Sequence, residues 1–157
     1  MQIKRLLSLC LLALLLFSSI CQAEEENMQF VDADGGTGYY VDVDSIAFSE
    51  VTEKVYPEPI LSDDPSKPPV ILPPREETRE IVKARIAVVK AYTNRRYLQY
   101  VKFDPARSEY QILASKTQQY DTRKQLDKSE TPQPVMKYGQ ESAYRAIVDF
   151  IYEQKKQ

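Results

Sequence analysis

Histidine and tryptophan are absent from this 157-residue chain, and its two cysteines, Cys10 and Cys21, both lie near the N-terminus. Catalytic triads with His, thiol nucleophiles beyond position 21 and ordinary zinc sites all need side chains that the rest of the chain lacks. No other catalytic constellation is visible in the sequence. We therefore expect a protein that is not an enzyme, with no catalytic residue, no metal site and no cofactor.

The first 23 residues have the pattern of a cleavable secretory signal. Lys4 and Arg5 precede an apolar stretch over residues 6–20, and small residues stand at the −3 and −1 positions of the segment 21–23. This apolar stretch has 15 residues, fewer than the roughly 20 that a membrane-spanning helix needs. We expect cleavage after Ala23, no transmembrane segment in the mature chain, and export to the periplasm or the cell surface.

Two alternative interpretations of this segment keep the chain at a membrane. One is an uncleaved anchor. The other is a lipid attached to Cys21, but Ile20 is bulkier than the small residue expected before a lipidated cysteine. Cleavage would remove both cysteines, so the core of the mature chain, residues 24–157, would hold without a disulfide.

Charge is unevenly distributed along the mature chain. Residues 24–65 hold twelve acidic side chains and one basic one, whereas residues 75–107 hold nine basic and four acidic ones. The whole mature chain has 19 basic and 23 acidic residues, a formal charge of −4. This balance and the predicted export both argue against nucleic acid as a partner.

The first part of the mature chain is typical of short strands. Gly35 and Gly36 permit the positive φ of a hairpin turn, and the side-chain oxygens of Asp44 and Ser45 suit a second turn. The expected order is a strand over 28–32, a turn at 34–36, a strand over 37–43, a turn at 44–45, and short extended pieces at 46–48 and 51–56.

Residues 57–80 differ in composition from both flanks. Seven of the ten prolines lie between Pro57 and Pro74, among polar and charged residues. Proline lacks the N–H that a sheet needs and favours an extended, solvated backbone. We expect a mobile proline-rich insert between two strands; the alternative is a proline-rich docking segment.

The strongest strand signal follows the insert. Val82, Ala84, Ile86 and Val88 alternate with other residues, as a half-buried strand requires. The same period continues in a return strand over residues 96–103. Turns are expected at 93–95 and 104–107, a third strand at 110–114 with an extension at 118–121, and irregular structure over 122–138.

The chain ends in a predicted amphipathic helix. Tyr144, Ile147, Val148 and Ile151 have the i, i+3, i+4, i+7 spacing of one helix face. Glu141 precedes Arg145 by four residues, the spacing of a favourable ion pair in a helix. The sheet is the available packing partner, so residues 24–157 are expected to form a single α+β domain.

Four segments in this order carry a resemblance to a known family. They are Tyr39-Tyr40-Val41-Asp42-Val43-Asp44-Ser45-Ile46, Tyr100-Val101-Lys102-Phe103-Asp104, Tyr110-Gln111-Ile112-Leu113-Ala114-Ser115, and the helix around Ala146-Ile147-Val148. Over about residues 28–154 the chain resembles the surface-adhesin protein E family of exported bacterial proteins. The resemblance implies an antiparallel sheet of about six strands curved around the C-terminal helix. It also implies relatives that bind host extracellular-matrix proteins and, in the adhesin type, a disulfide between helix and sheet that this mature chain lacks.

Acidic residues offer two weak candidate sites. Counted from Asp32 as a calcium loop, the chain has Thr37 and Val43 where an EF-hand needs Gly and Glu, so we expect a hairpin turn there. Asp42 and Asp44 would share a strand face, as paired catalytic carboxylates do. The surrounding residues favour turn capping and solvation for both carboxylates.

Alternation also places several cations on one face of the predicted sheet. Lys83 and Arg85 alternate with the apolar residues of the first strong strand, and Arg96, Tyr100 and Lys102 alternate with those of the return strand. These five residues are the candidate binding residues, for an acidic protein or an anionic glycan. The alternative is that acids from the N-terminal half, such as Glu50 and Glu53, pair with these bases.

The favoured functional hypothesis is an exported, non-enzymatic interaction module of the bacterial envelope that binds host-matrix or other envelope partners. The alternative is a soluble periplasmic structural or stress-related protein with the same fold and no adhesin activity. The third hypothesis is an enzyme, and no arrangement of catalytic residue types in the sequence supports it.

Overall fold

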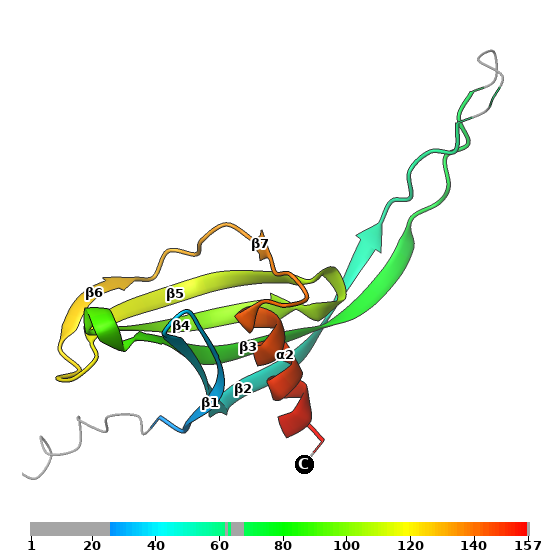
Figure 1. Cartoon of the computed structure of the whole chain (residues 1–157). Helices are drawn as coiled ribbons and strands as arrows, with labels where there is room; N and C mark the ends of the chain where they lie inside the picture. The colour runs from blue at the N-terminus through cyan, green and yellow to red at the C-terminus, as the bar shows by residue number, and fades with distance from the viewer. Residues whose placement is uncertain (1–25, 62, 64–67, 157) are drawn as a thin grey trace, which may run out of the picture.

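One antiparallel sheet and one C-terminal helix form most of the protein, whose structure is a computed structural model (Figure 1). It describes residues 26–61, 63 and 68–156; the predicted signal, residues 1–23, lies outside them. The described strands are β1 (Met28–Asp34), β2 (Thr37–Val55), β3 (Arg75–Lys90), β4 (Arg95–Asp104), β5 (Glu109–Gln119), β6 (Gln125–Ser129) and β7 (Met136–Lys137). β1 to β6 lie in chain order, β7 pairs with β5, and the helix is α2 (Ala143–Gln154). The predicted α+β class, with an antiparallel sheet against a C-terminal helix, is confirmed.

The expected turns at 34–36, 93–95 and 104–107 are present. Gly35 and Gly36 have φ of 52° and 78°, which glycine adopts without steric cost. The other two turns begin with the 3-10 helices η1 (Ala91–Thr93) and η2 (Pro105–Arg107). Asn94 and Ser108 end these helices in the left-handed conformation, so the chain reverses within a few residues at each point.

The prediction of a turn at 44–45 is wrong. β2 continues through it, and a bulge takes up the extra residues: Asp42 pairs with Arg85, whereas Ala47 pairs with Lys83. The Ser45 hydroxyl donates to the Asp42 carbonyl and accepts from the Arg85 N–H, both at 2.7 Å. The polar side chain that suggested a turn instead stabilises the bulge.

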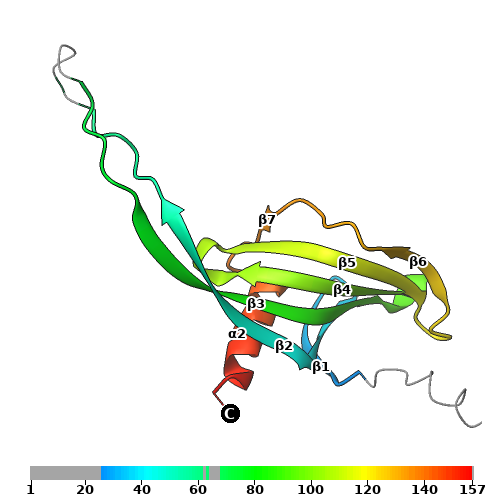
Figure 2. The same cartoon turned by 180° about the vertical axis from the view of Figure 1, so that it is seen from behind.

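Beyond the bulge, β2 and β3 leave the body of the sheet as a two-stranded ribbon (Figures 1 and 2). In this ribbon the pairing runs from Val51–Arg79 to Val55–Arg75. Farther out, the backbones of Ile60 and Val70 exchange two N–H···O=C hydrogen bonds, of 3.0 and 2.9 Å. We call residues 51–61, 63 and 68–79 the arm. The proline-rich insert lies between two strands as expected, but residues 75–80 belong to β3 because they pair with β2. Residues 62 and 64–67 lie outside the described ranges, and the mobility of the insert stays a prediction.

The prediction of irregular structure over 122–138 is also wrong in part. β6 pairs with β5 from Ser115–Ser129 to Gln118–Gln125, and β7 adds two residues to the same strand at its other end. β6 and β7 are edge strands with mostly exposed side chains, so they need no apolar alternation. The unpaired edge of β5 supplies the hydrogen-bonding groups that place them.

The helix packs its apolar stripe on one face of the sheet. Ile147, Val148 and Ile151 are buried, as the spacing predicted, against a core that includes Val41, Ile86 and Phe103. The Ser142 hydroxyl accepts from the Arg145 N–H and caps the helix. Because Glu141 precedes the helix, Arg145 pairs with Asp149 at 3.0 Å instead of with Glu141. In the described ranges, no helix is long and apolar enough to span a membrane.

Candidate functional site

The sheet face opposite α2, which we call the helix-free face, carries the predicted cations. Side chains alternate along each strand, so Lys83 and Arg85 of β3 point away from α2, as do Tyr100 and Lys102 of β4. The register pairs Lys83 with Lys102 and Arg85 with Tyr100. Four of the five sequence candidates are therefore direct neighbours on one surface, and Arg96 lies farther along β4 on the same face.

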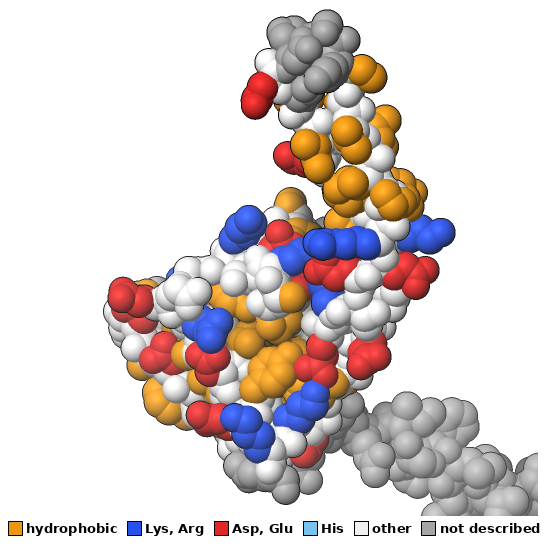
Figure 3. Space-filling model, turned by 90° about the vertical axis from the view of Figure 1, so that its right-hand side faces the viewer, with side chains coloured by type: hydrophobic (Ala, Val, Ile, Leu, Met, Phe, Trp, Pro, Cys, Tyr) orange, Lys and Arg blue, Asp and Glu red, His pale blue; other side chains and the backbone are white. Residues whose placement is uncertain are grey.

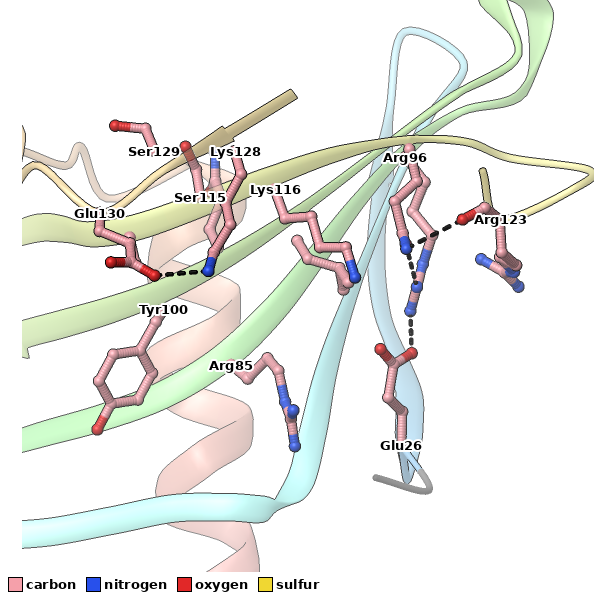
Figure 4. Close-up of a pocket in the computed structure, with 14 residues that line it drawn as sticks. Glu26, Arg85, Arg96, Tyr100, Ser115, Lys116, Arg123, Lys128, Ser129 and Glu130 are labelled. Atoms are coloured by element: carbon pink, nitrogen blue, oxygen red, sulfur yellow. Dashed lines mark hydrogen bonds and ion pairs between the residues drawn. The ribbon is translucent and has the colours of Figure 1, made fainter. Parts of the chain in front are cut away.

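A groove of about 720 Å³ is hollowed into this face (Figure 4). The helix lies behind the sheet in that view, so the groove and α2 are on opposite sides. Arg85, Arg96 and Tyr100 line the groove, whereas Lys83 and Lys102 lie outside its lining. The described residues that line it are Glu26, Arg85, Arg96, Leu98, Gln99, Tyr100, Ala114, Ser115, Lys116, Gln118, Arg123, Lys128, Ser129 and Glu130.

Apolar and cationic side chains share the groove. Leu98, Tyr100 and Ala114 come from the neighbouring strands β4 and β5, and the Tyr100 side chain is exposed. Among the described residues of the lining, five cations, contributed by β3 to β6 and the β5–β6 turn, stand against two carboxylates: the cations are Arg85, Arg96, Lys116, Arg123 and Lys128, and the carboxylates are Glu26 and Glu130. The groove is thus locally positive in a chain with a negative net charge.

Both carboxylates of the groove are already paired. Glu26 binds the guanidinium of Arg96, which is 5% exposed and also donates to the Gln118 side chain at 3.1 Å. Lys128 contacts Glu130 at 2.5 Å and holds the pKa of that carboxyl below its usual range. Neither acid is therefore free to neutralise the remaining cations.

Two of the remaining cations have no carboxylate partner within the described ranges. Lys116 lies directly opposite Lys128 across β5 and β6, an arrangement of like charges that costs stability. The Arg123 guanidinium stacks over the Tyr120 ring at 5.5 Å and makes no ion pair with a described residue. An anion bound in the groove would offset the repulsion between these cations.

Arg85 is held by a buried carboxylate, which corrects the solvation expected for Asp42. The Asp42 side chain is fully buried and accepts from Arg85 at 2.7 and 2.8 Å, and from the Asn27 N–H at 3.1 Å. Asp44 is exposed and accepts from the Asn27 side chain at 3.3 Å. Register explains the difference, because Asp42 directly faces Arg85 just before the bulge.

The expected pairing of N-terminal acids with these bases is right in kind but uses other residues. Glu26 and Asp42 pair with Arg96 and Arg85. Glu53 instead binds Arg79 in a bidentate pair at 2.8 Å, and this guanidinium lowers the pKa of Glu53 to about 2. The Glu53 pair lies at the base of the arm, away from the groove.

A smaller cavity of about 190 Å³ adjoins this second cluster. Arg79 is almost buried and also contacts Asp104 at 2.5 Å, while Arg107 reaches Glu53 at 3.2 Å. Lys102 lines this cavity and not the groove. The network joins β2, β3 and β4 where the arm leaves the sheet, which is a structural role. No group of three acidic, His or Cys side chains that could hold a metal is found among the described residues.

Comparisons with family models, with curated proteins and with solved structures gave no match. The resemblance to the surface-adhesin protein E family stays a prediction.

Sequence reasoning missed Lys116, Arg123 and Lys128 as groove residues. The signal for Lys116 was present, because the alternation of β5 continues past Ala114, where the predicted strand ended. No periodic signal marks Arg123 or Lys128, which reach the groove through an edge strand and its turn.

Proposed function

We propose that this protein is an exported, non-enzymatic interaction module of the bacterial envelope that binds an acidic protein segment in its groove. The observation that carries the proposal is the excess of cations over carboxylates in the groove, with Lys116 and Arg123 lacking carboxylate partners in the described structure. The groove volume is in the range of about 300–1,000 Å³ that ligand sites occupy. A surface-adhesin-like role, with host-matrix or envelope proteins as partners, is consistent with this chemistry.

The apolar part of the groove favours a protein segment over an anionic glycan. Tyr100 and Ala114 offer apolar contact area, which the apolar side chains of a protein segment can bury more fully than hydroxylated, charged sugar rings can. An exposed tyrosine in the same groove as several cations is also typical of the centres of protein interfaces, where Tyr and Arg are enriched. A protein segment with acidic and apolar side chains would use both kinds of contact.

A second candidate is a soluble periplasmic structural or stress-related protein that has the same fold and no adhesin activity. Its support is that Arg85 and Arg96, two of the five predicted binding residues, pair with Asp42 and Glu26 of the same chain. Such pairs stabilise the sheet whether or not a ligand binds.

The test compares two double variants of equal charge. Lys116→Ser/Arg123→Ser removes the groove cations without carboxylate partners, and Lys137→Ser/Lys156→Ser removes two exposed cations outside the groove. Binding of a fluorescent glutamate-rich peptide is measured by anisotropy across a salt gradient. We expect the groove variant to bind at least tenfold more weakly, equivalent to about 1.4 kcal/mol, and the control to match the wild type.

Equal affinities for both double variants would show that the groove is only a solvated face. A different result would assign the groove to a glycan instead: the wild type is retained on heparin, the groove variant is not, and neither binds the peptide. Surface labelling of intact cells then separates the two functional candidates, because a protein reached only after outer-membrane permeabilisation is not an adhesin. The export proposal itself requires an intact mass that begins at Glu24.

A further inference from the structure

The arm exposes a set of large apolar side chains far from the core. Their exposed fractions are 73% for Tyr56, 55% for Ile60, 79% for Leu61, 57% for Val70 and 78% for Ile71. Figure 3 shows hydrophobic side chains gathered along the arm, where it stands clear of the body. Such exposed apolar patches mark surfaces that bind a partner.

The same region is acidic and conformationally restricted. The sequence between 56 and 74 holds three acidic residues, Glu58, Asp63 and Asp64, and one basic residue, Lys67, a formal charge of −2. Prolines at 57, 59, 68, 69, 73 and 74 favour an extended backbone, which lowers the entropy lost on docking. Asp63 lies between the apolar residues Leu61 and Val70 in the sequence, so insertion of these side chains into lipid would also bury its charge.

The arm therefore has the composition that the groove fits. The groove supplies cations such as Lys116 and Arg123 for Glu58 and Asp63, and the side chains of Tyr100 and Ala114 for the apolar residues. The arm cannot reach the groove of its own chain. It leaves one end of the sheet, whereas β6 and the start of β4, which carry groove cations, lie at the other end (Figures 1 and 2).

We propose that the arm of one copy docks into the groove of a second copy, so that the proposed acidic partner segment belongs to this same protein. The inference rests on the proposed function of the groove. Each copy would have one arm and one groove, so the contact is heterologous and builds a ring or an open chain of copies. Exposed apolar side chains on the arm would then be covered in the assembly.

The test is a mixing experiment with the mature chain. Ile60→Ser/Ile71→Ser removes apolar contacts of the arm at two exposed positions, and Lys116→Ser/Arg123→Ser removes the groove cations. We expect the wild type to associate with rising concentration in sedimentation velocity, and each double variant alone to stay monomeric. A mixture of the two variants should form a 1:1 dimer and nothing larger, because only one intact arm and one intact groove can meet.

The charge-matched variant Lys137→Ser/Lys156→Ser should associate like the wild type. A wild type that stays monomeric overturns the inference. If that monomer co-sediments with vesicles of phosphatidylethanolamine and phosphatidylglycerol, the arm binds lipid and the inference is also overturned. A groove variant that associates like the wild type, while the arm variant does not, shows that arms pair with another surface and also overturns it. If the wild type binds the glutamate-rich peptide but does not self-associate, this inference fails and the proposed function stands. If it neither binds the peptide nor self-associates, both the inference and the proposed function are refuted.

Discussion

Replacing Ile147 by Ala tests how the helix holds the sheet. Ile147 is fully buried in the core that joins α2 to β3 and β4. The substitution removes three carbon groups, and at about 0.8 kcal/mol each their transfer to water costs about 2.4 kcal/mol. The cavity left in a close-packed core raises the loss of unfolding free energy into the range of about 2–5 kcal/mol. For a chain of this size, we expect the melting temperature to fall by roughly 10 °C.

The control is Arg145→Ala, on the outer face of the same helix. Its guanidinium is partly exposed and contacts Asp149 at 3.0 Å, an i,i+4 pair that contributes about 0.5 kcal/mol or less. Urea denaturation followed by circular dichroism gives both free energies, and an unchanged m-value shows that the two unfolding reactions are comparable. Equal losses for the two variants would refute the docking of α2 through Ile147.

Three further predictions concern polar clusters and the arm. Asp42→Asn should lower the free energy of unfolding in urea by about 3 kcal/mol, because it removes the charge of a fully buried carboxylate that accepts from Arg85; a loss below about 1 kcal/mol would mean that the pair is solvated. Because Arg79 lowers the pKa of Glu53 to about 2, the stability from this pair should be present above the ordinary carboxyl pKa and lost as pH falls from about 4.5 to about 2. Thermal melts of Glu53→Gln should therefore vary less with pH over that interval, and an unchanged slope would count against the pair. Replacing residues 56–74 by a short turn should leave the melting temperature of the monomer nearly unchanged, since the described side chains of this segment lie mostly outside the core; a large drop would show that the segment packs on the body.

Periodicity alone identified the elements that bury a continuous apolar face. The alternation of Val82 to Val88 and the helical spacing of Ile147 and Ile151 both correspond to core residues. These patterns are local, because a half-buried strand or helix must repeat its apolar positions with its own period. The class α+β, the β3–β4 hairpin and the C-terminal helix could therefore be predicted from the sequence.

The groove depends on contacts that no local pattern contains. β6 has no apolar period, and the unpaired edge of β5 positions it, bringing Lys128 opposite Lys116. Burial is likewise a property of the folded chain: Arg96 has the sequence pattern of a surface cation, but Glu26, 70 residues away, and Gln118 accept its hydrogen bonds and allow it to be buried. The sequence by itself determined which strands have a polar face. Only the tertiary structure decided which of those cations are neutralised and which remain to bind, because ion pairs form between residues that are distant in the chain.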